Sequence, residues 1–200
     1  AAPELAPVLR SEPVNPNPVA KESQFDAVVS ADGSGTHTTV QAAVHASPTN
    51  SPKPFVILVK PGRYVGHLVV PANRPHITLR GEPAELTNTV ITGGLNVKTP
   101  TPDGKTVSTR DSSTVLVQGA DFTAENITFE NTTTREDRVQ ALAMYVEADR
   151  AVFRQCRFLG WQDTLRADAP RPCTMITAVG TGIGDGDGEA DPFHENGVGE

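Results

Sequence analysis

Apolar and polar residues alternate in short runs through the middle of the chain, and turn-forming residues separate these runs. This pattern is typical of β-strands, and Pro61-Gly62 and Gly93-Gly94 are typical turn residues. We therefore expect strands at Ala27–Val29, Phe55–Val59, Tyr64–Val70, His76–Leu79 and Thr89–Ile91. Thr38–Ala46 has apolar residues at helical spacing, with Thr38 or Thr39 as the candidate N-cap. It predicts one short helix that closes one end of the strands.

Residues 114–129 and 143–158 form an internal repeat. Ala120-Asp121 falls on Ala148-Asp149, whereas Ile127–Phe129 falls on Cys156–Phe158 at a spacing that is longer by one position, so one inserted residue is expected between the two registers. Strands repeated at such a period indicate a solenoid, in which each rung buries its inner face against its neighbours. A leucine-rich repeat is disfavoured because its Leu/Asn spacing is absent, and a β-sandwich remains an alternative. The expected inward positions are Val115, Val117, Ile127, Phe129, Met144, Val146, Cys156 and Phe158.

The two ends of the chain differ from this middle part. Residues 1–24 contain five prolines and predict an extended Pro-rich arm. Residues 25–166 form the expected stacked-strand domain, with a polar surface loop at 96–112. After Leu165 the strand unit does not recur, and residues 167–200 are predicted to be an aberrant Gly-rich, acidic tail.

Composition excludes several classes of function. The net charge of -7 argues against binding driven by neutralisation of nucleic-acid phosphates. No apolar run approaches the ~20 residues that span a bilayer, so no membrane partner is expected. Cys156 and Cys173 permit one disulfide at most, and the five histidines lack metal-ligand spacing. The start carries no leader pattern, which fits either a cytosolic protein or one whose signal peptide has been removed.

Gln140, Gln162 and Asp163 are the candidate site residues. The two glutamines are separated by about one rung of chain, and would therefore stack on one face with Asp163 and Trp161 beside them. Amide N–H groups can hold an oxyanion, and a partly buried carboxylic acid can protonate a leaving alkoxide, so this set suits acyl chemistry. The alternative is an amide ladder that satisfies backbone groups, with Asp163 capping a turn. Spacing alone favours that alternative.

Several ordered motifs resemble those of one family. Gly35–Ala43 resembles G-x-(Y/F)-x-T-V-Q-x-A, Pro61–Tyr64 resembles the start of G-x-Y-x-E, Gln140–Ala143 resembles Q-A-V-A, and Gly160–Leu165 resembles G-(Y/W)-Q-D-T-L. Over residues ~25–166 the chain thus resembles the pectin methylesterases, which are carbohydrate esterases. The resemblance implies an all-β fold, a right-handed parallel β-helix with one short N-terminal capping helix, here incomplete at the C-terminal end.

The resemblance also implies an activity, the hydrolysis of galacturonate methyl esters in pectin to methanol and free carboxylate. Asp163 would be the general acid/base, Gln162 and Gln140 would stabilise the tetrahedral intermediate, and Trp161 and Thr39 would contact substrate. No metal or organic cofactor is implied. The partner would be methylated homogalacturonan, and the protein would be a secreted monomer.

The sequence departs from the family pattern at several places. It contains no D-F-I-F-G motif, which supplies the nucleophilic Asp, and no G-R-P-W motif, whose Arg fixes that Asp. Gly66 stands where the family has Glu in G-x-Y-x-E. The change of texture after about Arg166 predicts a truncated or frame-shifted C-terminus. Three hypotheses follow: a pectin esterase, an inactive β-helix that binds galacturonan, and a chain that cannot complete its fold.

Overall fold

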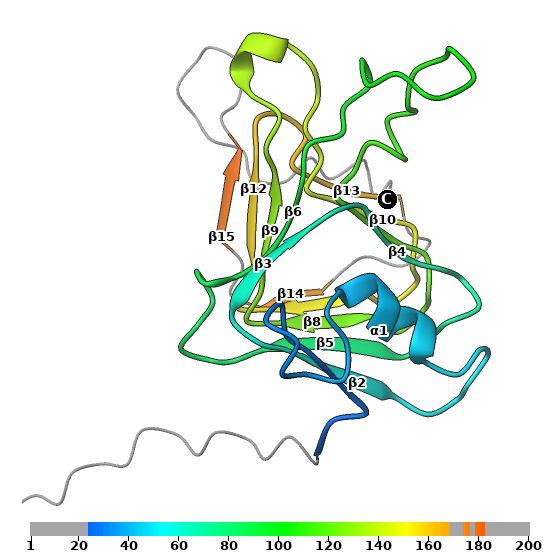
Figure 1. The fold of residues 1–200 in the computed structure, drawn as a ribbon. Coiled ribbons are helices and arrows are strands. Elements are labelled where there is room, and N and C mark those ends of the chain that lie inside the picture. The colour runs from blue at the N-terminus through cyan, green and yellow to red at the C-terminus, as the bar shows by residue number, and fades with distance from the viewer. Residues whose placement is uncertain (1–23, 169–173, 177–178, 183–200) are drawn as a thin grey trace, which may run out of the picture.

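The computed structural model describes residues 24–168, 174–176 and 179–182, and it winds short strands into a coil (Figure 1). All strands fall into three parallel sheets. Sheet A contains β1 (Ala27–Val29), β2 (Phe55–Val59), β5 (Ile77–Gly81), β8 (Thr123–Glu125), β11 (Val152–Arg154) and β14 (Thr174–Ile176). Sheet B contains β3 (Gly62–Val65), β6 (Thr89–Gly93), β9 (Thr128–Asn131), β12 (Arg157–Gly160) and β15 (Val179–Gly182). Sheet C contains β4 (Leu68–Val70), β7 (Val115–Val117), β10 (Met144–Val146) and β13 (Leu165–Ala167).

From β2 onward, the chain passes through sheets A, B and C in that order, and each passage forms one rung. The strands of successive rungs pair in parallel, so the predicted parallel β-helix is confirmed. The expected strand Tyr64–Val70 is in fact two strands, β3 and β4. Between them lies Gly66, whose φ of 146° is open to glycine but rarely adopted by other residues. A corner at this point turns the chain from sheet B into sheet C.

The repeat is regular, and the predicted inserted residue is wrong. Val115 pairs with Met144, Thr123 with Val152 and Thr128 with Arg157, so the spacing is identical in all three sheets. The corner between these ladders therefore keeps the same length. Asp121 (φ 58°) lies over Arg150 (φ 59°), and the guanidinium Nη2 donates to the Asp121 carboxylate at 2.6 Å. The two Ala-Asp pairs look alike in sequence but occupy positions that differ by one.

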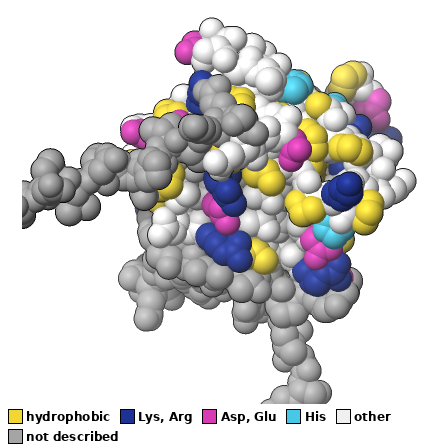
Figure 2. Space-filling model, turned by 90° about the horizontal axis from the view of Figure 1, so that it is seen from below, with side chains coloured by type: hydrophobic (Ala, Val, Ile, Leu, Met, Phe, Trp, Pro, Cys, Tyr) yellow, Lys and Arg dark blue, Asp and Glu magenta, His cyan; other side chains and the backbone are white. Residues whose placement is uncertain are grey.

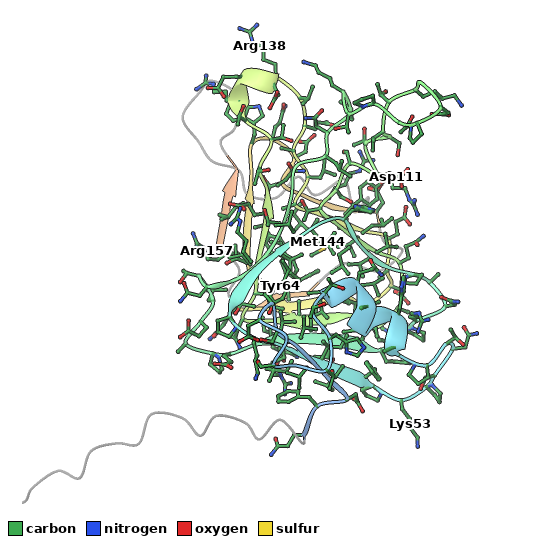
Figure 3. All side chains as sticks on the ribbon, viewed as in Figure 1. Lys53, Tyr64, Asp111, Arg138, Met144 and Arg157 are labelled. Carbon is green, nitrogen blue, oxygen red and sulfur yellow. The ribbon has the colours of Figure 1, made fainter. Side chains whose placement is uncertain are left out.

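The core consists of ladders of inward-facing side chains. All eight predicted inward positions are buried, which confirms the predicted pattern. Aromatic rings continue from rung to rung, with Phe129 stacked on Phe158 at 5.5 Å and Phe153 edge-on to Phe158 at 5.5 Å. Figure 3 shows Met144 within the coil, whereas Lys53 and Arg157 lie on its outside. No rung could bury these residues without its neighbours.

A short helix, α1 (Val40–Ala46), covers the N-terminal end of the coil, as predicted (Figure 1). The Thr39 hydroxyl caps it by accepting from the Ala42 amide at 3.2 Å. Its buried face packs against β1, β2 and β4 through Val40, Ala43 and Val44. No helix in the described part of the chain is long and apolar enough to cross a bilayer.

The outer face of sheet A carries opposite charges on neighbouring strands. Arg80 on β5 donates to Glu125 on β8 at 2.6 Å, and Arg154 on β11 lies 3.3 Å from the same carboxylate. Figure 2, which views the molecule from the side of sheet A, shows positive and negative side chains interspersed on this face. Cross-strand pairs of this kind favour the observed register, because like charges would face each other in several shifted ones.

The coil extends beyond the predicted boundary at residue 166. Strands β14 and β15 pair in parallel with β11 and β12, so part of a fifth rung is formed from residues of the expected tail. Cys156 is a buried free thiol, and burial raises its pKa to about 12. Cys173, residues 1–23 of the expected arm, and residues 183–200 of the expected tail lie outside the described residues.

The aromatic ladder yields a stability prediction. Phe129→Ala removes a fully buried ring that stacks on the next rung and should lower the free energy of unfolding by about 3–5 kcal/mol. Phe129→Leu should cost less, because it leaves a smaller cavity. Val65→Ala, at an 81% exposed position of the same sheet, is the matched control and should change little. Urea unfolding of the three variants measures this, and equal stability of Phe129→Ala and Val65→Ala would contradict the ladder.

Candidate active site

The candidate site lies where two successive rungs enter sheet C. Gln140 precedes β10, and Gln162 and Asp163 precede β13. The Ala141 amide donates to the Gln162 carbonyl at 2.9 Å, and the Ala143 amide donates to the Thr164 carbonyl at 2.9 Å. The parallel ladder thus already begins before the two strands and holds both segments side by side.

Gln140 and Asp163 are brought together by this ladder. In sheet C, Met144 pairs with Leu165, and this register leaves the two glutamines offset by one position instead of stacking directly. The Gln140 carboxamide nitrogen donates to the Asp163 carboxylate. Gln140, Gln162 and Asp163 are all half-buried. A carboxamide and a carboxylic acid from adjacent rungs therefore meet at one partly exposed corner.

Asp163 has an unusual backbone conformation. Its φ is 51°, in the left-handed region that is uncommon for residues other than glycine. Aspartate and asparagine tolerate this region better than most residues, because their short polar side chains can bond locally. Asparagine is therefore the replacement that removes the acid with least disturbance of the corner.

Asn131 holds the segment that carries Gln140, and sequence reasoning missed this role. Its side chain is buried, and its amide nitrogen donates to the carbonyls of Leu142 at 3.1 Å and Leu95 at 3.0 Å. Its side-chain oxygen accepts from the Thr133 amide at 2.9 Å. These bonds join three separate segments around the corner. In the sequence, Asn131 stands out only as the first residue of an Asn-x-Thr triplet, which gives no sign of these contacts.

The two expected substrate contacts occupy different places. Trp161 directly precedes Gln162, and the guanidinium carbon of Arg135 lies 5.1 Å from the centre of its ring. Thr39 instead lines a hollow of about 160 Å³ beside the β3–β4 corner, together with Val65, Gly66 and His67. In sheet C, β4 is two strands away from β10, a separation of about 10 Å. The structure thus places Trp161, but not Thr39, next to the Gln140–Asp163 pair.

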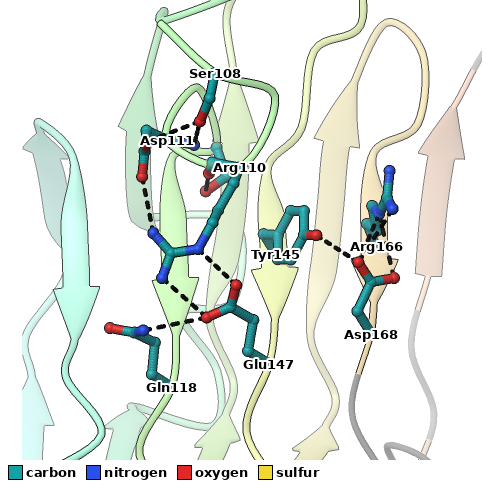
Figure 4. A network of polar contacts seen from close by, with 9 residues as sticks. Ser108, Arg110, Asp111, Gln118, Tyr145, Glu147, Arg166 and Asp168 are labelled. Atoms are coloured by element: carbon teal, nitrogen blue, oxygen red, sulfur yellow. Dashed lines mark hydrogen bonds and ion pairs between the residues drawn. The ribbon is translucent and has the colours of Figure 1, made fainter.

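Charged side chains brace the outer face of sheet C (Figure 4). Arg110 donates twice to Glu147, at 2.5 and 2.9 Å, and Gln118 donates to the same carboxylate at 3.1 Å. These bonds, the Arg110 bond above all, hold the pKa of Glu147 below its ordinary value. They join the loop before β7 to the end of β10, and so they fix the strand that follows Gln140.

A second group in Figure 4 lies on the next strand. The Tyr145 hydroxyl donates to Asp168 and holds the pKa of that carboxyl below its ordinary value, with Arg166 at 3.1 Å contributing. The Tyr145 ring packs against Leu116 and Leu142 in a small cluster outside the coil. Tyr145 is thus a packing residue of the outer wall, 8% exposed, and most of its surface is covered by protein.

Chemically, the corner offers an amide donor, a neighbouring carboxylic acid and an aromatic ring. An amide N–H can stabilise an oxygen that becomes negative during acyl transfer, and the acid can donate a proton to a leaving alkoxide. Nucleophilic attack on the acyl carbon would need a further group. Within the described residues, Gln140 is hydrogen-bonded to one carboxylate, that of Asp163.

The Glu147 network predicts a pH-dependent stability. Because the folded-state pKa lies below the ordinary value of 4.5, the network stabilises the fold above pH 4.5, and this contribution disappears as the pH falls through the folded-state pKa. Glu147→Gln should therefore be less stable than the unmodified protein at pH 7, and the difference should shrink at pH 3. Thermal unfolding at both pH values measures this, with Glu82→Gln as control. A difference that is equal at both values would contradict it.

Comparison with known proteins places the chain among its relatives. The family model for pectinesterases matches residues 26–183. A pectinesterase from Petunia integrifolia is 39% identical over 158 residues, which cover 77% of this chain and 40% of that protein. The probable pectinesterase/pectinesterase inhibitor 58 of Arabidopsis thaliana is 41% identical over 162 residues, which cover 79% of this chain and 27% of that protein.

Solved structures give the same result. The structure of pectin methylesterase from carrot superposes with a TM-score of 0.70 at 35% identity, covering 86% of this chain and 48% of that one. A pectin methylesterase in complex with hexasaccharide VII superposes with a TM-score of 0.63 at 30% identity, covering 78% of this chain and 52% of that one. The chain spans less than half the length of the two curated relatives. Over residues 26–183, it belongs to the pectinesterase family.

Proposed function

We propose that this chain acts on pectin and hydrolyses the methyl esters of its galacturonate units to methanol and free carboxylate. The observation that carries the proposal is the hydrogen bond from the Gln140 carboxamide to the Asp163 carboxylate across adjacent rungs. Family membership supports the same activity. Pectin is a wall polysaccharide, and we therefore also propose that the protein acts outside the cell, as a monomer.

Each residue of the corner has a proposed role. Asp163 protonates the departing methoxide and afterwards accepts a proton from the water that releases the acid product. The carboxamides of Gln140 and Gln162 donate to the oxyanion of the tetrahedral intermediate. Trp161 contacts a sugar ring beside the ester, and Thr39 contacts the polymer about two strands further along the coil. In the resembling family, an aspartate of the D-F-I-F-G motif attacks the ester, and this motif is absent from the printed sequence.

That absence favours a second candidate function, the binding of galacturonan without turnover. A corner with an acid and amide donors but without a nucleophile would recognise the polymer and cleave it slowly. The related pectin methylesterase that was solved with a hexasaccharide supports oligosaccharide binding on this fold. The two candidates differ in one product, methanol.

Methanol release from highly esterified pectin tests the first candidate. Asp163→Asn should lower the rate by about 10²-fold or more, because it removes the general acid while tolerating the left-handed backbone. Gln140→Leu should lower it by about 10²-fold, the typical effect of losing one oxyanion donor. Asp103→Asn, which changes an exposed aspartate of a distant loop, should leave the rate unchanged.

Binding to immobilised pectin separates the remaining outcomes. Retained binding without methanol release would reject hydrolysis and support the second candidate. Methanol release that is the same in Asp163→Asn and in the unmodified protein would reject the assigned role of Asp163. A folded chain that neither binds pectin nor releases methanol would exclude both functions.

A further inference from the structure

Arg135 lies over the ring of Trp161 at the edge of the candidate site. Its guanidinium carbon is 5.1 Å from the ring centre, within the range of a cation–π contact. Arg135 belongs to the 3-10 helix η2 (Arg135–Asp137), which lies in the loop between β9 and β10. This loop and the loop before β7 rise together above the coil (Figure 1).

The local structure holds Arg135 in place. The Asp137 carboxylate accepts from the Thr134 amide at 3.0 Å, and Lys98 of the neighbouring loop donates to the Asp137 carbonyl at 2.5 Å. Arg138 ends η2 in a left-handed conformation, and Figure 3 shows it at the outer tip of the loop. Two arginines of one short segment thus have different surroundings. One is laid on an indole, and the other lies at the tip.

Trp161 links Arg135 to the candidate site. It directly precedes Gln162 and Asp163, and the bond between the Ala141 amide and the Gln162 carbonyl sets it beside Gln140 in the ladder. The charge of Arg135 therefore flanks the Gln140–Asp163 pair at the end from which both strands begin.

Arg135 lacks the acidic partner that most of its counterparts have. Side-chain carboxylates pair with Arg63, Arg80, Arg110, Arg150, Arg154 and Arg166. Arg135 is exposed and forms no ion pair with any residue that the structure describes. Its guanidinium is thus positioned by an aromatic ring, while no carboxylate in the described part of the chain uses its N–H donors.

We propose that Arg135, supported by Trp161, binds the free carboxylate of a galacturonate unit that neighbours the methyl ester at Asp163. The inference rests on the proposed function and adds a charge preference to it. A guanidinium presents two parallel N–H donors that match the two oxygens of a carboxylate, and a methyl ester offers no such anion. The site would therefore favour partly de-esterified pectin over the fully esterified polymer.

Fluorescence titration tests this directly, because Trp161 is the single tryptophan of the chain. The full chain is titrated with trigalacturonate and, separately, with its fully methyl-esterified form. The acid should bind about tenfold more tightly than the ester, as expected for one charge-assisted contact. Arg135→Gln should bring the affinity for the acid down to that for the ester and leave the ester unchanged. Arg135→Lys should retain part of the preference.

Arg138→Gln is the matched control, since it removes the same charge from the same loop without touching the ring. It should keep the preference for the acid, and circular dichroism verifies that all variants are folded. Binding of the ester with no preference for the acid, or equal effects of Arg135→Gln and Arg138→Gln, would overturn the inference and leave the proposed function standing. A protein that binds neither oligosaccharide would overturn both.

Discussion

Contact between successive rungs is the interaction on which the whole structure depends. A single rung of three short strands has one apolar side, and only the rungs above and below can cover it. Phe129, Phe153 and Phe158 show this most clearly, because each ring packs on a ring of another strand. The backbone bonds follow the same rule, since every strand pairs with strands of neighbouring rungs. Stability and register therefore arise together.

The candidate site is a product of that register. The parallel ladder of β10 and β13 begins before the strands themselves, and this places Gln140 against Asp163. Asn131 and the Arg110–Glu147 pair then fix the two ends of the segment that carries Gln140. None of these supporting residues needs to touch a substrate. They act by limiting how far the corner can move.

Residues with strong local signals could be predicted from the sequence, whereas residues defined by long-range contacts could not. The apolar ladder positions and the helix after Thr39 follow from periodicity and a capping residue, and the structure has both. Sequence similarity misaligns the repeat at Asp121, because two Ala-Asp pairs look alike while left-handed corners at Asp121 and Arg150 decide the true register. The continuation into β14 and β15 escapes the sequence pattern because pairing with an existing edge can order strands of weak apolar character.

For the site, motif spacing brings Gln140, Gln162 and Asp163 to attention, but their exact offset depends on loop length. The loop between β9 and β10 spans residues 132–143, whereas residues 161–164 connect β12 to β13. The shorter connection shortens the repeat in sheet C, so that the step from Met144 to Leu165 takes less chain than the step from Val115 to Met144. The contact of Arg135 with Trp161 depends on how the longer loop folds back, and no periodic pattern encodes it.

The long loops of the described chain leave the stack at one corner, between sheets B and C, as residues 94–114 and 132–143. Insertions there do not alter the strands of the rungs, since each rung is held only by its neighbours. Selectivity can therefore diverge among related proteins by exchange of these loops while the aromatic column stays the same. The fold separates a conservative interior from a corner that is free to vary.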